Sequence, residues 1–196
     1  MIRMKRAIIG VIGILFLTQF AVAQDKGDNL SPQRKQAIDS LALEKVRDLS
    51  KYISIIGDKK TPWSEAQRVI ERAEELFMPG SEIGVSSLSR PDVNNYKVRE
   101  YFDRLMQLNY DKVVIDWYKI QYVSDLERQP DGTYVGVITI FQRFQGYDQE
   151  KGLVYEDTTK KDITVYVKRK ETQIGGRLIG FWDVLLGDIR VKETSK

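Results

Sequence analysis

The chain has 196 residues, with 31 Lys and Arg against 28 Asp and Glu, and it contains neither cysteine nor histidine. Without cysteine it can form no disulfide framework, thiolate nucleophile or iron–sulfur site, and without histidine it can form no Ser-His-Asp or Cys-His catalytic group and no zinc site of the usual ligands. Any catalysis would depend on carboxylates, tyrosines, lysines or arginines.

The first 23 residues have the pattern of a secretory signal peptide. Basic residues within 3–6 precede an apolar run from Ala7 to Leu17, and Ala21-Val22-Ala23 supplies a small-x-small cleavage site. The alternative is an uncleaved membrane anchor, which usually requires about 20 predominantly apolar residues. The run from Ala7 to Leu17 is shorter than that. We therefore predict cleavage before Gln24 and an exported protein, periplasmic or extracellular. We expect no stable membrane anchor, because no cysteine for lipid attachment follows the site.

Removal of this leader would change the charge balance. It takes away three of the 31 basic residues and no acidic residue, which leaves 28 of each. Basic patches supply most of the non-specific affinity for nucleic acid. We therefore expect no nucleic-acid partner, and we interpret Lys168-Arg169-Lys170 as a solvated strand end or turn.

The residues after the leader are predicted to form a flexible segment over 24–30 and a single domain over 31–196. A domain of this size buries about 70% of its unfolded surface, enough to fold without covalent cross-links. The first helix is expected to begin at Ser31, an N-cap, with Pro32 in the first turn, and to end at Gly57. Its apolar residues recur every three or four positions: Ile38, Leu41, Ala42, Val46, Leu49, Ile53 and Ile56.

A second helix is predicted after Thr61-Pro62, with an apolar face that runs from Trp63 to Phe77. The segment 81–89 alternates apolar residues with serines and predicts a short edge strand or an extended loop. A third helix is expected to start near Pro91-Asp92 and to end before Asn109.

From Lys112 the apolar period changes to two, which indicates strands. Val113–Ser124 and Tyr134–Tyr147 are rich in β-branched and aromatic residues, and Asp131-Gly132 between them is a strong hairpin signal. A flat strand as long as the second would span about 46 Å, too long for a small domain, so the sheet is expected to curve. Glycines within the strand patterns are expected at bulges or bends: Gly136, Gly146, Gly180 and Gly187.

A polar loop is predicted from Asp148 to Lys161, ahead of a second hairpin. The arms of this hairpin are Asp162–Glu171 and Arg177–Lys192, with Gly175-Gly176 in the turn. In the first arm three alternate positions are apolar and the residues between and after them are polar or aromatic, so one face of the sheet is expected to be buried and the other solvated. The apolar positions are Ile163, Val165 and Val167.

This order of elements resembles that of the nuclear transport factor 2-like superfamily, also called SnoaL-like or ketosteroid-isomerase-like, over residues 30–193. The fold class expected is α+β, with three N-terminal helices packed on a strongly bent antiparallel sheet in a cone-shaped, cystatin-like roll. The resemblance implies a pocket between the sheet and the helices. A cystatin-like domain, with one helix on a bent four-stranded sheet, is the nearest alternative.

Aromatic residues of the strands are candidates for the walls of such a pocket, although they equally suit plain packing of a bent sheet. These candidates are Trp117, Tyr118, Tyr122, Phe141, Phe144 and Trp182. Asp116 and Asp183 are candidate general bases, since each lies among apolar neighbours in a predicted strand, and Arg143 is a candidate for stabilising an oxyanion. The alternative is that each aspartate simply points to solvent.

The sequence favours an exported, non-catalytic domain that binds a small apolar ligand or another envelope protein. A homodimer through the exposed sheet face is a further expectation. The alternative function is a histidine-free isomerase or lyase that acts on a small apolar substrate with a strand aspartate as base. We expect no cofactor and no metal ion.

Overall fold

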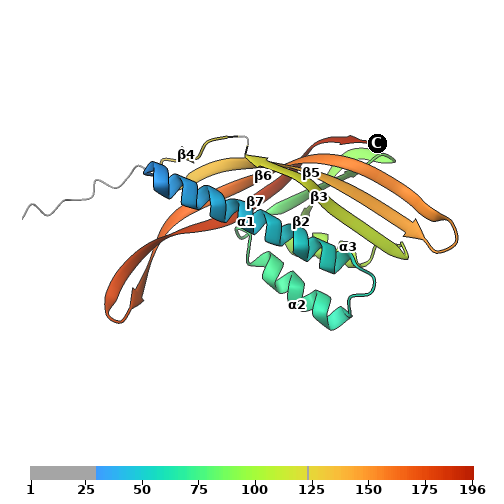
Figure 1. The fold of residues 1–196 in the computed structure, drawn as a ribbon, viewed down its shortest axis with the longest axis horizontal. Coiled ribbons are helices and arrows are strands. Elements are labelled where there is room, and N and C mark those ends of the chain that lie inside the picture. Colours follow the sequence, from blue (N-terminus) through green and yellow to red (C-terminus); the bar gives the residue numbers. More distant parts are fainter. Residues whose placement is uncertain (1–29, 123) are drawn as a thin grey trace, which may run out of the picture.

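The computed structural model describes residues 30–122 and 124–196 (Figure 1). The predicted leader over 1–23, and all but the last residue of the segment 24–30, lie outside the described residues. No helix within the described ranges combines the length and the apolar character needed to cross a bilayer.

Three helices and seven strands make up the described chain, so the expected α+β class is confirmed. In chain order they are α1 (Pro32–Gly57), α2 (Trp63–Glu74), β1 (Glu82–Ser87), β2 (Arg90–Lys97), α3 (Val98–Met106), β3 (Lys112–Tyr122), β4 (Glu127–Arg128), β5 (Tyr134–Asp148), β6 (Gly152–Ile174) and β7 (Arg177–Ser195).

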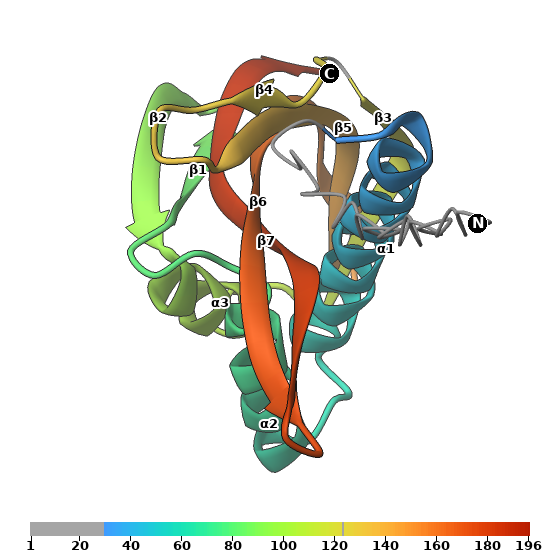
Figure 2. The same ribbon diagram turned by 90° about the vertical axis from the view of Figure 1, so that its left-hand side faces the viewer.

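The strands form one open sheet in the order β2-β1-β7-β6-β5-β3, with β4 paired to β5. All pairs are antiparallel except β1 with β7, which run parallel and meet at Ile83 and Ile189. The sheet is therefore mixed. Figure 2 shows it curving, with α1 along one side and α2 and α3 beneath.

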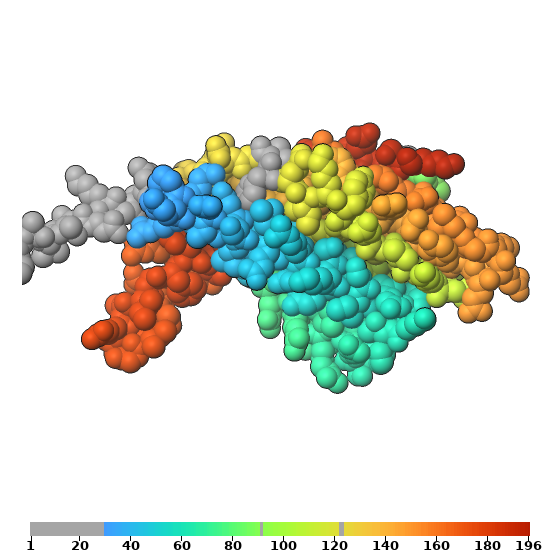
Figure 3. Space-filling view, in the orientation of Figure 1, coloured from blue at the N-terminus to red at the C-terminus, as the bar shows by residue number. Residues whose placement is uncertain are grey.

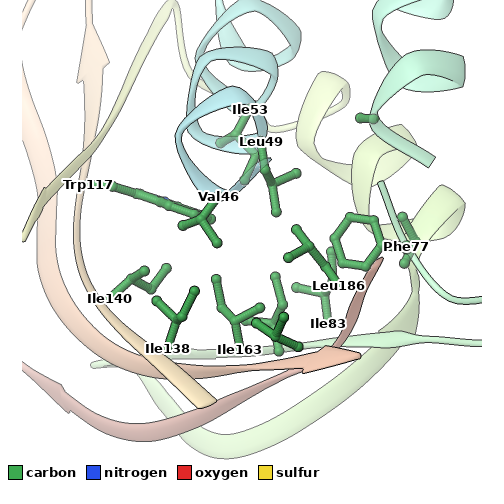
Figure 4. Packing of buried hydrophobic residues seen from close by; sticks show 14 of the residues in the cluster. Val46, Leu49, Ile53, Phe77, Ile83, Trp117, Ile138, Ile140, Ile163 and Leu186 are labelled. Atoms are coloured by element: carbon green, nitrogen blue, oxygen red, sulfur yellow. The ribbon is translucent and has the colours of Figure 1, made fainter. Parts of the chain in front are cut away.

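Helix α1 begins and ends where the sequence predicts. The Ser31 hydroxyl accepts a hydrogen bond of 3.3 Å from the backbone N–H of Arg34, and Pro32 occupies the first turn. The predicted apolar stripe faces the concave side of the sheet, where Val46, Leu49 and Ile53 meet the strand side chains (Figure 4). Burial of this stripe against the sheet holds the helix in place.

The expected bend of the sheet is also confirmed, and it coincides with irregular strand pairing. The register shifts between Gly146 and Tyr147 on β5, and again opposite Gly187, where Val165 pairs with Leu186 but Ile163 pairs with Ile189. A Cβ atom on Gly187 would overlap the ring of Tyr166. Such bulges increase the local twist, which lets long strands wrap around a small core.

The third helix starts later than the sequence predicts. Residues near Pro91-Asp92 belong to β2, which pairs with β1 from Glu82 opposite Lys97 to Ser87 opposite Arg90, and α3 begins only at Val98. Strands β1 and β2 therefore precede α3. The Pro-Asp pair resembles a local helix start, but pairing with β1 holds this backbone extended.

The expectation of an edge strand or loop at 81–89 was half right. Strand β1 is present, but it lies between β2 and β7 rather than at the edge. The second helix was predicted too long, because α2 ends at Glu74 and Phe77 forms an isolated bridge with Leu186 of β7. Trp63, assigned to the apolar face, is 65% exposed.

The predicted polar loop over 148–161 was wrong. Strand β6 begins at Gly152 and pairs with β5 from Val167 opposite Tyr134 down to Gly152 opposite Asp148. The turn at Asp131-Gly132 also differs from the prediction, since it joins the short β4 to β5 rather than β3 to β5. The turn between β6 and β7 lies at Gly175-Gly176, as predicted.

The ends of β6 and β7 extend beyond the body of the molecule as a two-stranded arm (Figure 3). Every residue from 171 to 180 is exposed. The apolar side chains on this arm are Ile174, Leu178, Ile179 and Phe181, and Leu178 is 73% exposed. The arm therefore adds little to the core.

Candidate functional site

A cavity of about 330 Å³ opens between the inner face of the sheet, helix α3 and the β1–β2 hairpin. One wall is apolar, since Leu105 and Leu108 come from α3 and its C-terminal end and Val85 comes from β1. Tyr101 of α3 also lines it, and burial raises the pKa of that phenol. This position, between the concave face of a bent sheet and a helix, is where the resemblance implies a pocket.

The floor of the cavity comes from the inner face of β6. Ile163, Val165 and Val167 on this face are fully buried in the core, as the alternation predicts. Toward the start of the strand the same face carries Lys161, Thr159 and Asp157, which line the cavity and are likewise almost completely buried: 4%, 2% and 4% exposed. One strand face thus passes from the apolar core to a polar site.

Lys161 is the least satisfied of these groups. Its ammonium forms no hydrogen bond and no ion pair within 4.0 Å with any described residue, and its one electrostatic partner is Asp157. Burial lowers the pKa of Lys161 to about 8, against the opposing attraction of Asp157. An amine that is mostly charged at neutral pH therefore faces the cavity without a hydrogen-bond acceptor from the described residues.

Asp157 differs from Lys161, because its carboxylate has a hydrogen-bond partner in the protein. The Tyr155 hydroxyl donates to it at 2.5 Å. Burial raises the pKa of Asp157, while the bond from Tyr155, the charge of Lys161 and the nearby Thr159 hydroxyl oppose the shift. Burial and the bond to Asp157 raise the pKa of Tyr155 to about 12.

The rim of the cavity carries a second cation. The guanidinium of Arg104 lies 4.2 Å above the ring of Tyr96 and donates to its hydroxyl at 3.3 Å. The same side chain forms an ion pair of 3.5 Å with Glu100, one helical turn away. Arg104 is thus stacked and paired, in contrast to Lys161.

One of the predicted wall residues, Phe144, lines the cavity. Trp117 does not line it, but its buried indole N–H donates to the side-chain oxygen of Gln142 at 3.1 Å, and Gln142 is a lining residue. Tyr122 belongs to β3, but its side chain is not among those the structure describes.

The candidate catalytic pair lies on the other side of the sheet. Asp116 and Arg143 are cross-strand neighbours with a 3.7 Å ion pair, and their side chains are 56% and 45% exposed. Tyr118 and Phe141 share this outer face, with ring centroids 6.1 Å apart. None of these four residues lines the cavity.

Asp183 and Trp182 lie near the base of the arm. The carboxylate of Asp183 forms a 2.5 Å ion pair with Lys170 of the neighbouring strand. Trp182 packs edge-on against Tyr134 at 5.7 Å, beside a separate hollow that Lys168 also lines. The structure therefore does not bring Asp183 together with Asp116 or with the cavity.

Sequence reasoning missed Lys161, Thr159 and Asp157, which it placed in a polar loop. A usable signal was present, since the odd-numbered positions from 155 to 167 form one continuous period-two series. Polar residues on the inner face concealed that series, because strand prediction expects the inner face to be apolar.

No group of three or more acidic side chains in the described ranges is arranged to hold a metal ion. A scan against protein-family models finds no match to this chain, and a search of curated proteins finds none either.

Proposed function

We propose that this chain is a non-catalytic ligand-binding domain whose small, mostly apolar ligand occupies the cavity beside β6. The observation that carries the proposal is Lys161, a residue only 4% exposed whose ammonium opens into the cavity without a hydrogen bond or ion pair to any described residue. Buried polar groups in proteins are almost always hydrogen-bonded, and an unpaired buried charge is costly. A ligand acceptor at Lys161 would offset that cost.

The rest of the cavity suits the same function. Small-molecule sites are typically concave, about 300–1,000 Å³ in volume, and mainly apolar with a few polar groups that fix orientation. At about 330 Å³, with Leu105, Leu108 and Phe144 beside Lys161, this cavity has both the size and the composition expected.

A nuclear transport factor 2-like, cystatin-like roll remains our proposal for the fold family. A bent sheet with α1 on its concave face and a cavity between sheet and helices supports it. The signal-like leader supports export to the periplasm or beyond, where the ligand would be encountered.

We favour binding over catalysis because of where the candidate bases lie. Asp116 and Asp183 each form an ion pair outside the cavity, with Arg143 and Lys170. A general base must lie within hydrogen-bond reach of the proton it removes, and neither aspartate lines the cavity. The carboxylate that does line the cavity, Asp157, already accepts a hydrogen bond from the Tyr155 hydroxyl.

The test uses a neutral apolar fluorophore, phenylnaphthylamine, whose emission rises on transfer from water to an apolar site. Wild-type protein should bind it at one saturable site. Leu108→Trp, which fills the cavity, should weaken binding about tenfold or more, whereas Leu153→Trp, on an exposed residue of β6, should not.

Circular dichroism would confirm that both variants are folded. Equal binding by the two tryptophan variants would place the fluorophore elsewhere, and no binding by the wild type would leave the cavity without the proposed role. Either result overturns the proposal.

A further inference from the structure

Deepening the proposed function, on which this inference rests, we propose that the ligand is an apolar carboxylic acid whose carboxylate binds the ammonium of Lys161.

The charge inventory leaves one cation without an ion pair. Among the described residues that line the cavity, Lys161 and Arg104 are cationic and Asp157 is anionic. Arg104 has its ion-pair partner in Glu100, and Asp157 has a donor in the Tyr155 hydroxyl. The group left to be neutralised at close range is Lys161.

The donor inventory points the same way. An ammonium has three N–H donors and no acceptor, and those of Lys161 have no hydrogen-bond partner among the described residues. A neutral acceptor such as an alcohol would engage the donors but would leave the charge uncompensated in a buried setting. A carboxylate would accept hydrogen bonds from these donors and would also neutralise the charge. Hydrogen bonds between ionised groups are roughly twice as strong as neutral ones.

The nearby Asp157 limits the charge of the ligand to one. It lies on the same strand face as Lys161 and is 4% exposed, so its field is only partly screened by water. A doubly charged phosphate monoester would be repelled by it more strongly than a monoanion. An alkylammonium would meet Lys161 itself as a like charge.

The apolar wall of the cavity would contact the hydrocarbon part of the ligand. Leu105 and Leu108 line the cavity from the α3 side and Val85 from β1, whereas Lys161 belongs to the sheet floor. A ligand with its carboxylate on the floor would therefore pack its hydrocarbon part against these side chains. That arrangement requires an amphipathic acid rather than a small, fully polar one.

The test is displacement of phenylnaphthylamine near neutral pH by three probes with the same chain: octanoate, octanol and octylamine. Octanoate should displace the fluorophore at a concentration about tenfold lower than octanol, and octylamine should be the weakest. Lys161→Met should abolish the difference between octanoate and octanol by weakening octanoate alone.

Lys160→Met is the matched control, because Lys160 is the adjacent residue of β6 and points to the opposite face. This control variant should leave unchanged the concentrations at which octanoate, octanol and octylamine displace the fluorophore. Lys161→Gln, which keeps a donor but removes the charge, is a second variant at the site and should also lose the preference for the acid.

The outcomes separate this inference from the proposed function. Three results would show that the ligand is not a carboxylic acid, while leaving the binding cavity intact. They are equal displacement by octanol and octanoate in the wild type, strongest displacement by octylamine, and no displacement by any probe of a fluorophore that does bind. If the preference for octanoate persists in both Lys161 variants, Lys161 is not the anchor. If the fluorophore itself does not bind, the proposed function fails and this inference fails with it.

Discussion

The backbone N–H of Leu88 donates a hydrogen bond of 3.0 Å to the phenol oxygen of Tyr155, 67 residues further along the chain. Leu88 lies in the turn between β1 and β2, and Tyr155 lies near the start of β6. The same phenol donates to Asp157. One hydroxyl thus fastens the β1–β2 turn to the sheet at the edge of the cavity.

Tyr155→Phe should loosen this turn. The change leaves the buried carboxylate of Asp157 without one donor and the N–H of Leu88 without its acceptor, and should cost about 1–3 kcal/mol in the free energy of unfolding. Hydrogen exchange at Leu88 should accelerate, as measured by mass spectrometry. Tyr118→Phe is the control, since Tyr118 is 48% exposed on the outer face, and it should change neither quantity. Equal effects of the two substitutions would contradict this account.

Lys161→Met should alter the pH dependence of stability. The folded pKa of Lys161 is about 8 because of burial, below the ordinary 10.5. Between these values the unfolded chain binds more protons, so the free energy of unfolding should rise with pH, by roughly 3 kcal/mol at most. The variant should lack that rise and should be more stable than the wild type near neutral pH.

Urea denaturation at a series of pH values up to about 10 would measure this difference. The upper limit matters because burial raises the pKa values of Tyr155 and Tyr101. Ionisation of tyrosines in the unfolded chain lowers stability above about pH 10. Parallel pH profiles for wild type and variant would show that Lys161 is not buried as described.

Gly146→Ala should be destabilising because of a single ring. A Cβ atom at this position would lie 2.5–2.7 Å from three ring atoms of Tyr110, so the ring or the strand must move. We expect a loss of about 1–3 kcal/mol. In a Tyr110→Ala background the same substitution should cost much less, which a double-mutant cycle in chemical denaturation would measure. Additive effects would mean that the ring does not limit the position.

Gln142→Leu should remove the acceptor of the buried indole N–H. Trp117 is 8% exposed and donates to Gln142 at 3.1 Å. The unpaired N–H should cost about 1–3 kcal/mol. Combined with Trp117→Phe, which deletes the donor, Gln142→Leu should be nearly neutral. A full penalty in that background would assign the cost to packing instead.

The arm should tolerate polar substitution. Leu178→Ser and Ile179→Ser together should change the free energy of unfolding by less than about 0.5 kcal/mol, because both side chains are exposed. Leu186→Ala, at a fully buried position of the same strand, should cost about 2–5 kcal/mol. A large effect of the serine pair on thermal unfolding would show that the arm is part of the cooperative unit.

The sequence was sufficient to predict the elements whose signals are local. The stripe from Ile38 to Ile56 predicted α1 and its buried face, because apolar residues spaced every three or four positions all lie on the side of a helix that packs against the core. The start of α3 was not predictable in this way, since residues near Pro91 pair with β1, which precedes them in the chain. The Pro-Asp sequence alone does not show that these residues pair with another strand.

The candidate site was largely beyond the reach of the sequence for a related reason. A lysine at position 161 normally indicates a solvated surface, and only the covering by α3 and the β1–β2 hairpin makes Lys161 buried. Phe144 was predicted as a wall residue because aromatic residues suit pockets. Asp116 was singled out by its apolar neighbours, but strand alternation places it on the outer face, opposite Arg143.

The parallel contact of β1 with β7 has a consequence for how the chain acquires its structure. Ile83 and Ile189 are neighbours in the sheet although about a hundred residues separate them, and β2 joins the sheet only through β1. The hairpins β3–β5 and β5–β6 can form early, but the sheet is complete only once β7 has been synthesised and inserted between β1 and β6. Such non-local closure slows folding. In a partly synthesised chain the edges of β1 and β6 that pair with β7 would therefore stay unpaired until β7 is made.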